Sequence, residues 1–322
     1  MQVKKYLKLR ALMRRVLGGS LSNTIRNLVV SLRYSLHLVP AEDRPRKDCV
    51  SALMRVRNEE LWIEPSILSI KDLVDEYVIV DASTDSTPII IERLAREYKL
   101  NIVHEMDFDS DIVRVSQKAL EMTSCRWILR WNGDFVMHER GVNTLKQIIE
   151  RFNRKRRYCT VYWPHVVLVG DLFHVDPQNV FQIEHWLTTY VPGMRFIRIP
   201  NGFEYLYVPS DLAYRIELRE PLSFHLKVDK PENLLVKKYR WECFLKNVEE
   251  PLDRYIKRRI VEEFGTADLN EAAKIYYTRL HEKLKPYDRG VLDYPEVLKR
   301  YVYRRFGIEL MLTEILNDRS TS

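Results

Sequence analysis

The sequence predicts an α/β fold in which a mostly parallel sheet is covered by helices on both faces. From residue 49 onward, short apolar runs typical of buried strands alternate with longer segments of helical periodicity. Parallel strands need such helical crossovers, and burial on both faces makes the strands almost continuously apolar. A chain of 322 residues with 46% hydrophobic and 30% charged residues is also typical of a folded globular protein.

The expected elements follow one another along the chain. Apolar runs predict strands at residues 49–56, 77–81, 100–104 and 126–131 and a strand-rich stretch at 158–170. Helical patterns are found at residues 59–73, 86–98, 110–122 and 141–153. The second of these helices starts at Ser86 or Thr87, because Pro88 suits a first helical turn. Residues 195–228 read as short strands and turns, and residues 231–318 as mostly helical.

These patterns divide the chain into a basic N-terminal arm (1–47), a central domain (48–228) and a helical C-terminal extension (229–322). Residues 1–40 contain eight Lys or Arg and no acidic residue, which leaves 44 basic against 45 acidic residues elsewhere. A nucleic-acid-binding protein would carry this excess in its folded domain, so we expect no nucleic-acid partner. Two amphipathic helical patterns, 3–17 and 25–36, suit either an anionic membrane surface or docking on the protein with the charges toward water.

The four cysteines are widely spaced and lack the spacing of a metal site. Three lie in apolar, strand-like surroundings, so we expect free buried thiols and a reducing, cytoplasmic compartment. No segment reaches the ~18 uninterrupted apolar residues of a membrane span. The first residues also lack the apolar core and cleavage site of a signal peptide. Contact with a membrane would therefore be peripheral, through the basic arm.

Polar residues follow four of the predicted strands. Because ligands bind beyond the carboxyl ends of parallel strands, these segments are expected to share one functional edge of the sheet. They are Arg57–Glu59, Asp81–Asp85, His104–Asp111 and Asn132–Asp134.

Several of these segments resemble motifs of glycosyltransferase family 2. Residues 55–60 (RVRNEE) are similar to the N-x-E turn after the family's first strand, and residues 80–87 (VDASTDST) to its D-x-S-x-D-x-T segment. Residues 127–134 (WILRWNGD) lie where the family carries its D-x-D motif, and residues 223–226 (SFHL) resemble the late histidine of many GT-A enzymes. The resemblance implies a GT-A fold, which is Rossmann-like, and transfer of a sugar from a nucleotide-diphosphate sugar to an acceptor hydroxyl.

The resemblance also assigns the metal site. Asp134 would hold a divalent Mn²⁺ or Mg²⁺ ion, and His225 would be a further metal or phosphate contact. Gly133 would let the chain approach the diphosphate closely. Asn132 stands in for the first acidic residue of the motif, so metal binding would be weaker or metal dependence lost.

Further residues would bind the donor. Asp81 resembles the residue that reads the nucleotide base, with a turn-stabilising role as the alternative. Nucleotide contacts are also expected from Arg114, or Lys118 in its place, and from four residues of the first two loops: Arg57, Asn58, Glu59 and Ser83. Capping of the following helix competes for Asn58, and Asp85 is expected to cap the helix near Thr87.

The catalytic base is harder to place. An inverting transferase needs one carboxylate to take the proton of the acceptor hydroxyl. Asp211 is the first candidate and Glu204 a close second, with Asp176 and Glu184 as outside alternatives.

The substrates can be named only by class. We expect a UDP- or GDP-sugar donor of the hexosyl type and a glycan or lipid-linked acceptor. A nucleotidyltransferase is disfavoured because no Gly-rich, basic loop follows the first strand. Two alternatives remain: a catalytically weak or inactive relative that binds a nucleotide sugar or glycan, suggested by Asn132, and a membrane-peripheral interaction protein, suggested by the arm.

Overall fold

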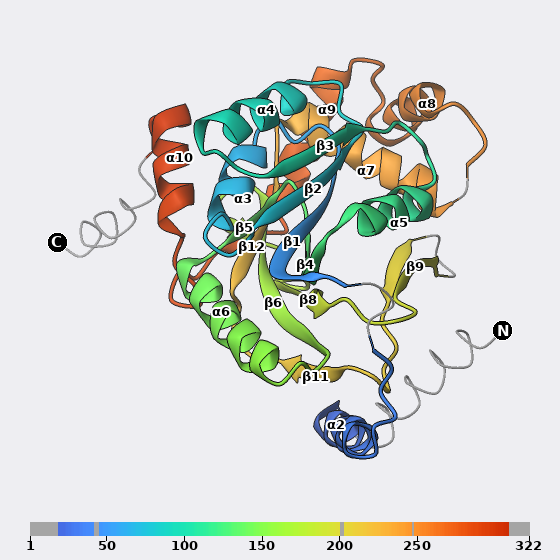
Figure 1. The fold of residues 1–322 in the computed structure, drawn as a ribbon. Coiled ribbons are helices and arrows are strands. Elements are labelled where there is room, and N and C mark those ends of the chain that lie inside the picture. Colours follow the sequence, from blue (N-terminus) through green and yellow to red (C-terminus); the bar gives the residue numbers. More distant parts are fainter. Residues whose placement is uncertain (1–18, 42–44, 200–202, 247, 309–322) are drawn as a thin grey trace.

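The computed structural model describes residues 19–41, 45–199, 203–246 and 248–308. The main sheet has the strand order β3-β2-β1-β4-β8-β6-β12-β5, with β11 paired to β6 (Figure 1). One half is parallel: β1 (Lys47–Val56), β2 (Glu76–Asp81), β3 (Ile102–Met106) and β4 (Cys125–Trp131). The other half is mixed: β5 (Phe135–Met137), β6 (Cys159–Gly170), β8 (Phe181–Thr189), β11 (Tyr214–Glu217) and β12 (Ser223–Val228). The predicted α/β fold is confirmed.

Helices cover both faces of the parallel half. One face packs against α3 (Ile63–Ser69), α4 (Thr87–Glu97) and α6 (Glu139–Arg154), through a core that contains Ala52 and Met54 of β1. The other face packs against α5 (Ile112–Met122), through a core that contains Leu53. Successive residues of a strand point to opposite faces, which is why β1 is apolar along most of its length.

The predicted elements are found with small shifts, apart from two differences. The helix expected at 59–73 is confined to α3, because residues 60–62 and 71–73 form turns. Strands β5 and β8 were not predicted. In β8, apolar and polar residues alternate only over Phe181–Glu184, and the end of this alternation before Trp186 and Leu187 weakens the strand pattern.

Two short ribbons complete the β-structure. One joins β9 (Arg195–Arg198) to β10 (Glu204–Tyr207). The other joins β7 (His174–Val175), just after β6, to β13 (Lys285–Pro286) near the C-terminus. The second ribbon therefore ties the C-terminal region to the end of β6.

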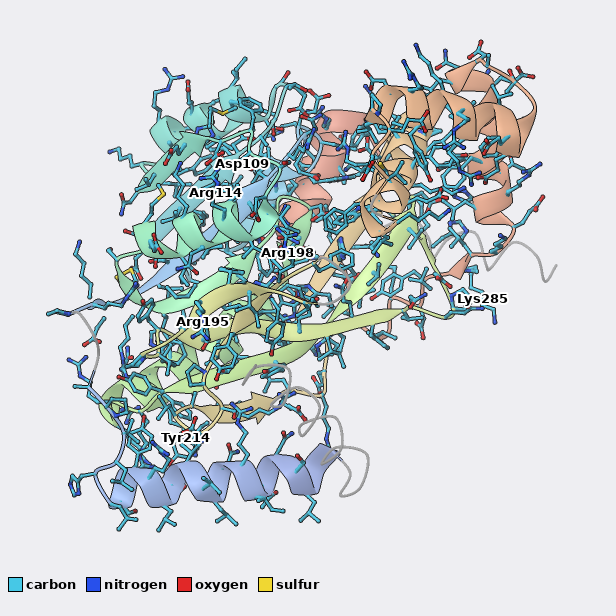
Figure 2. All side chains as sticks on the ribbon, turned by 90° about the vertical axis from the view of Figure 1, so that its right-hand side faces the viewer. Asp109, Arg114, Arg195, Arg198, Tyr214 and Lys285 are labelled. Carbon is cyan, nitrogen blue, oxygen red and sulfur yellow. A yellow bond between two sulfur atoms is a disulfide. The ribbon has the colours of Figure 1, made fainter. Side chains whose placement is uncertain are left out.

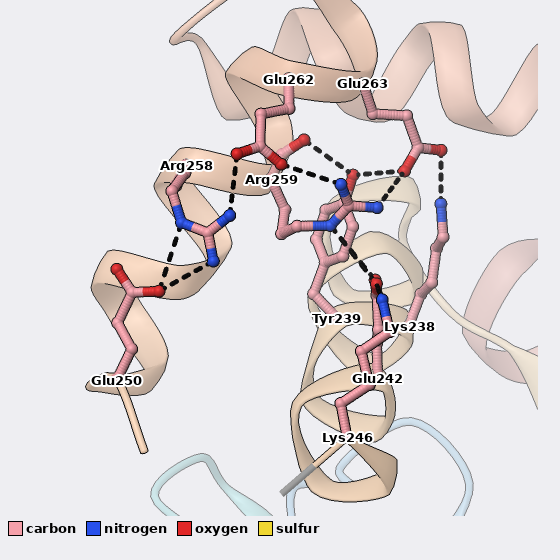
Figure 3. Close-up of polar contacts among 9 residues, drawn as sticks. All are labelled: Lys238, Tyr239, Glu242, Lys246, Glu250, Arg258, Arg259, Glu262 and Glu263. Atoms are coloured by element: carbon pink, nitrogen blue, oxygen red, sulfur yellow. Dashed lines mark hydrogen bonds and ion pairs between the residues drawn. The ribbon is translucent and has the colours of Figure 1, made fainter. Parts of the chain in front are cut away.

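The predicted C-terminal helical extension is confirmed over the residues that the structure describes. Helices α7 (Pro231–Leu245), α8 (Leu252–Phe264) and α9 (Leu269–His281) share a core of their own, and α10 (Glu296–Phe306) packs against the main domain. An ion pair and a hydrogen bond join α7 to α8 (Figure 3). Arg259 Nε of α8 lies 3.4 Å from Glu242 Oε1, and the Tyr239 hydroxyl donates to Glu263 at 2.9 Å. Helix α7 starts directly after β12, which places the beginning of the extension beside the sheet.

Helix α2 (Gly19–Ser35) docks on the protein through polar side chains. Asn27 exchanges hydrogen bonds with the backbone of Arg215 at 3.0 and 2.9 Å, and Ser31 contacts the Tyr214 hydroxyl at 3.1 Å. Apolar side chains occupy the outward face (Figure 2): Leu21, Leu28, Val29 and Leu32 are exposed. The helix thus docks as one alternative expected, but it turns apolar residues rather than charges to water. The helical pattern predicted at residues 3–17 lies outside the described residues.

The expectation of free thiols is wrong for two of the four cysteines. Cys49 of β1 and Cys125 of β4 form a disulfide, because these adjacent strands bring the two residues together. Cys159 is a buried free thiol, and Cys243 is half-buried. The inference of a reducing compartment rested on free thiols, and the bonded pair does not support it. None of the helices within the described ranges is long and apolar enough to cross a membrane.

Candidate active site at the carboxyl edge of the sheet

The loops after β1 and β2 are locked together by hydrogen bonds. The Asn58 amide donates to Ser83 Oγ at 2.7 Å, and the Thr84 amide donates to Asn58 Oδ1 at 2.8 Å. The Glu59 amide donates to Thr87 Oγ1 at 2.9 Å. Asn58 has a φ of +55°, a left-handed conformation that asparagine tolerates better than most residues. The two loops therefore form one rigid unit.

This bonding bears on the structural roles expected for two residues. Asn58 does not cap the following helix, whose N-cap is Trp62. Asp85 has the structural role expected of it, since its Oδ1 accepts from the Thr87 amide at 3.0 Å at the start of α4.

Asp81 is fully buried at the end of β2, and both of its carboxylate oxygens have partners. Oδ1 accepts from the Ser83 amide at 2.7 Å, and Oδ2 lies 3.1 Å from His104 Nε2. These contacts are those of the turn-stabilising alternative. A nucleotide base would have to share these oxygens with the loop.

Asp134 and His225 lie side by side, as the resemblance implies. His225 on β12 pairs with Phe135 on β5, which places its Nε2 atom 3.2 Å from Asp134 Oδ2. On the other side of the ring, Nδ1 lies 3.1 Å from Gln182 Oε1. Gln182 Nε2 donates to Glu184, which orients the amide oxygen toward His225.

This arrangement suits a cation between the carboxylate and the imidazole. Because Gln182 accepts the Nδ1 proton, a neutral His225 directs its Nε2 lone pair at Asp134. The Asp134 oxygen and the Nε2 lone pair are both acceptors, so this close contact is stable when a proton on Nε2 or a metal ion lies between them. An oxygen and a nitrogen ligand fit Mn²⁺ or another divalent ion.

Further charged groups adjoin this pair. Lys237 of α7 places its Nζ atom 3.4 Å from Glu59 Oε1 and 3.1 Å from Asp229 Oδ2. Glu59 also packs against Gly133, where an added Cβ would lie only 2.9 Å from Glu59 Cβ. We call Glu59, Asp134, His225, Asp229 and Lys237 the carboxyl-edge cluster.

The charges of the cluster act on one another. Burial and the negative charge of Asp134 raise the pKa of Glu59 to about 8. Burial acts to raise the pKa of Asp134, but the charge and hydrogen bond of a protonated His225, together with the charge of Lys237, lower it. For Lys237, burial is outweighed by Glu59 and Asp229, and the pKa is raised. The ammonium group of Lys237 is therefore a permanent positive charge in the cluster.

Sequence reasoning missed Lys237 and Asp229, because both lie in the extension and in no motif. The one signal available was that they follow closely on the strand that carries His225.

Two further predicted donor contacts lie around the cluster. Asn132 is exposed in the turn after β4, and its backbone carbonyl accepts from Ser66 Oγ at 2.8 Å. Arg57 is exposed and faces α7, where burial and its charge lower the pKa of Arg240. The exposure of Asn132 and Arg57 leaves both side chains accessible to a ligand.

The cations Arg114 and Lys118 of α5 pair with acidic residues at the end of β3 and in the loop that joins β3 to α5. Arg114 pairs with Asp109 at 2.5 Å and with Asp107 at 3.1 Å. Lys118 pairs with Glu105 and, at 3.1 Å, with Asp107. Such ion pairs are typical of a solvated helix face and need no diphosphate to satisfy the two cations.

The two main base candidates lie at opposite edges of the sheet. Asp211 comes just before β11, and β11 starts beside Cys159, the first residue of β6. Asp211 therefore lies at the amino edge of the sheet, where it pairs with Arg33 of α2 at 3.1 Å. Glu204 pairs at 2.8 Å with Arg55, a residue near the carboxyl end of β1. The preference for Asp211 is not supported, because the chain returns to the amino edge after β10.

The outside alternatives for the base have local partners. Asp176 Oδ1 accepts from the Gln178 amide within its own turn, at 2.9 Å. Glu184 lies 3.4 Å from Arg130.

Comparisons with known proteins agree with the motifs. Residues 51–205 match the family model described as glycosyl transferase family 2. An uncharacterized glycosyltransferase of Rickettsia bellii (strain RML369-C) is 31% identical over 110 residues, which make up 33% of this chain and 35% of that protein. The match thus spans about a third of this relative's length.

Solved structures show a weaker likeness. The crystal structure of S. aureus TarS 1-349 in complex with UDP-GlcNAc has 16% identity and a TM-score of 0.41, over 67% of this chain and 73% of that one. The structure of S. aureus TarS has 15% identity and a TM-score of 0.37, over 81% of this chain and 44% of that one.

The family match contains the two interlocked loops and the Asn132–Asp134 turn, in the order in which the motifs were found. Over residues 51–205, just under half of the chain, the resemblance to glycosyl transferase family 2 is therefore confirmed.

Proposed function

We propose that this protein transfers a hexosyl group, with inversion, from a UDP- or GDP-sugar to a hydroxyl of a glycan or lipid-linked acceptor. The match of residues 51–205 to the family model supports the transfer of a sugar. The observation that carries the proposal is the carboxyl-edge cluster, in which Asp134 and His225 adjoin a fixed positive charge, Lys237.

The cluster suits a diphosphate leaving group. When bound, a divalent ion held by Asp134 and His225 offsets the negative charge that develops on the departing diphosphate. Lys237 supplies a second positive charge, and Glu59 and Asp229 hold it in place. Since Asn132 lacks the charge of the family's first acidic residue, Lys237 accounts for part of the electrostatic stabilisation in this chain.

Glu204 is the proposed catalytic base. It lies at the carboxyl edge, its side chain is largely buried, and Arg55 fixes the orientation of its carboxylate. The deprotonated acceptor oxygen then attacks the anomeric carbon as the bond to the diphosphate breaks.

The metal assignment is tested with Asp134→Asn, which keeps the shape of the side chain and removes its charge. We expect turnover to fall at least 100-fold while the far-UV circular dichroism stays unchanged. Asp176→Asn is the matched control, because Asp176 is bonded only within its own turn. An Asp134→Asn protein with full turnover contradicts the assignment.

Nucleotide binding is tested separately by thermal-shift titration with UDP and GDP, with and without Mn²⁺. A rise in melting temperature with one of them supports the donor class, because a ligand that binds only the folded state stabilises it. If no nucleotide raises the melting temperature, the protein is an interaction protein rather than a transferase.

The base is tested by comparing two carboxylates. Glu204→Gln should lower kcat by about 10²–10⁴-fold and leave donor affinity unchanged. Asp211→Asn should leave kcat unchanged, because Asp211 lies at the amino edge. The opposite result would make Asp211 the base and refute the edge argument.

We also propose that α2 rests on an anionic membrane surface. Its outward face is apolar, with Leu28 and Leu32 exposed at 64% and 59%, and residues 1–40 are basic and free of acids. An apolar face beside basic residues fits the boundary between lipid head groups and acyl chains.

Vesicle sedimentation tests this surface. We expect the protein to sediment with phosphatidylserine-containing vesicles and not with purely zwitterionic ones. Leu28→Glu together with Leu32→Glu should abolish sedimentation. The matched control is Ile89→Glu, which alters an equally exposed apolar residue on α4. If the protein instead forms a dimer that the double variant abolishes, α2 is a self-association surface.

A further inference from the structure

Three potential metal ligands meet away from the carboxyl-edge cluster. Asp171 directly follows β6, His174 begins β7, and His281 is the last residue of α9. His225 lies opposite Val167 of β6, whereas Asp171 lies beyond the end of that strand. The group therefore joins the main sheet to the C-terminal extension.

The ligand atoms are already close together. His174 Nδ1 lies 2.8 Å and His281 Nε2 lies 3.0 Å from the same oxygen of Asp171. The possible ligand atoms, one from each residue, all lie within 4.8 Å of one another. In a tetrahedral zinc site with bonds of about 2.0–2.1 Å, neighbouring ligand atoms are about 3.3 Å apart. Small side-chain movements are enough to reach that geometry.

The hydrogen bonding of His281 favours a cation in this position. Its Nδ1 atom lies 3.0 Å from the backbone carbonyl of Tyr277, which can only accept a proton. Nδ1 therefore carries the hydrogen, and a neutral ring directs the Nε2 lone pair at the Asp171 carboxylate. Metal-bound histidines commonly donate their other ring N–H to a carbonyl in this way, which fixes the tautomer and the ring orientation.

The backbone makes room for this imidazole. Gly170 has a φ of +79°, and a Cβ at this position would lie 2.8 Å from Cε1 of His281. Any other residue would therefore push the ring away from Asp171. The side chains of Asp171, His174 and His281 are 24–32% exposed, so a water molecule can reach the remaining position.

We infer that Asp171, His174 and His281 bind one Zn²⁺ ion, with water as the fourth ligand. Two imidazoles and one carboxylate suit zinc and its neighbours in the transition series rather than Mg²⁺. The site is chemically distinct from the one proposed at Asp134 and His225. Its consequence is structural, because the ion ties α9 to the end of β6.

Calorimetric titration of the metal-stripped full-length protein with Zn²⁺ tests the site. We expect one ion to bind tightly and to raise the melting temperature. His281→Ala should weaken this binding at least 100-fold and abolish the thermal shift, and His174→Gln should do the same without disturbing the packing of His281 on Gly170. Co²⁺ in place of Zn²⁺ should give the intense ligand-field absorption of a four-coordinate ion, and this absorption should be lost in both variants.

Two control variants establish that the zinc ion binds at these three residues and not elsewhere on the protein. Glu282→Gln alters an exposed carboxylate next to His281 and should leave zinc binding unchanged. Asp134→Asn should also leave zinc binding unchanged. Loss of the proposed transferase site can therefore be distinguished from loss of the zinc site. If the wild-type protein binds no stoichiometric Zn²⁺, or if both histidine variants bind it as well as the wild type, the group is an ion-pair cluster of protonated imidazoles and not a metal site.

Discussion

The contact between Gly133 and Glu59 gives a sharp test of how the carboxyl-edge cluster is built. In Gly133→Ala, the new Cβ would lie 2.9 Å from both Cβ and Cγ of Glu59 and 3.4 Å from Cδ1 of Ile63. Carbon atoms in contact are normally about 3.5–4.0 Å apart, so the two loops must separate by roughly 0.6–1.1 Å. The Cβ of Glu59 cannot rotate away, because the Glu59 amide is held by Thr87.

The expected cost follows from this clash. Overpacking of a filled site destabilises a protein by about 1–3 kcal/mol. At about 2 kcal/mol, and with about 2–4 °C per kcal/mol for a domain of this size, the melting temperature should fall by about 4–8 °C. Glu59 should also move away from Lys237, so that donor affinity falls several-fold.

The measurements are urea unfolding, differential scanning calorimetry and nucleotide titration. Gly290→Ala is the matched control, because the atoms nearest to its new Cβ belong to the side chain of Asp288, closest at 3.0 Å. That variant should change stability by less than about 0.5 kcal/mol. A Gly133→Ala protein with wild-type stability and donor affinity would refute the packing described for this edge.

Three further predictions concern pH, the disulfide and a helix cap. Burial and Asp134 raise the pKa of Glu59 from about 4.5 to about 8, so the folded state holds this proton more tightly than the unfolded state. The free energy of unfolding should therefore fall as pH rises from about 4.5 to about 8. Urea unfolding at several pH values should show a less steep fall in Glu59→Gln. The disulfide between Cys49 and Cys125 spans 76 residues of chain, so Cys49→Ser should lower the free energy of unfolding by up to about 4–5 kcal/mol. If the variant is as stable as the oxidised wild type, the disulfide is absent in solution. Asp111 accepts from two amides at the start of α5, so Asp111→Ala should cost about 0.5–2 kcal/mol in the same assay, and no loss would exclude this cap.

Much of the parallel half of the fold was predictable from the sequence. Its strands are short apolar runs separated by amphipathic helices, and polar motifs mark their carboxyl ends. The pairing of Asp134 with His225 also followed, because the resemblance set both residues at known points of the fold.

The mixed half was less predictable, because its pairing depends on contacts distant in sequence. The polar residues of β8 obscured a central strand, and nothing local showed that β11 returns the chain to the amino edge and carries Asp211 with it. The register of β1 against β4, which brings Cys49 to Cys125, is likewise a property of the assembled sheet.

The position of Lys237 bears on how the proposed active site is divided along the chain. The family match ends at residue 205, while His225, Asp229 and Lys237 all come later. A fragment trimmed to the matched residues would keep Glu59 and Asp134 but lose the three residues that complete the cluster around them. Substitutions that retune the donor preference should consequently be sought at the start of α7 as well as within the family motifs.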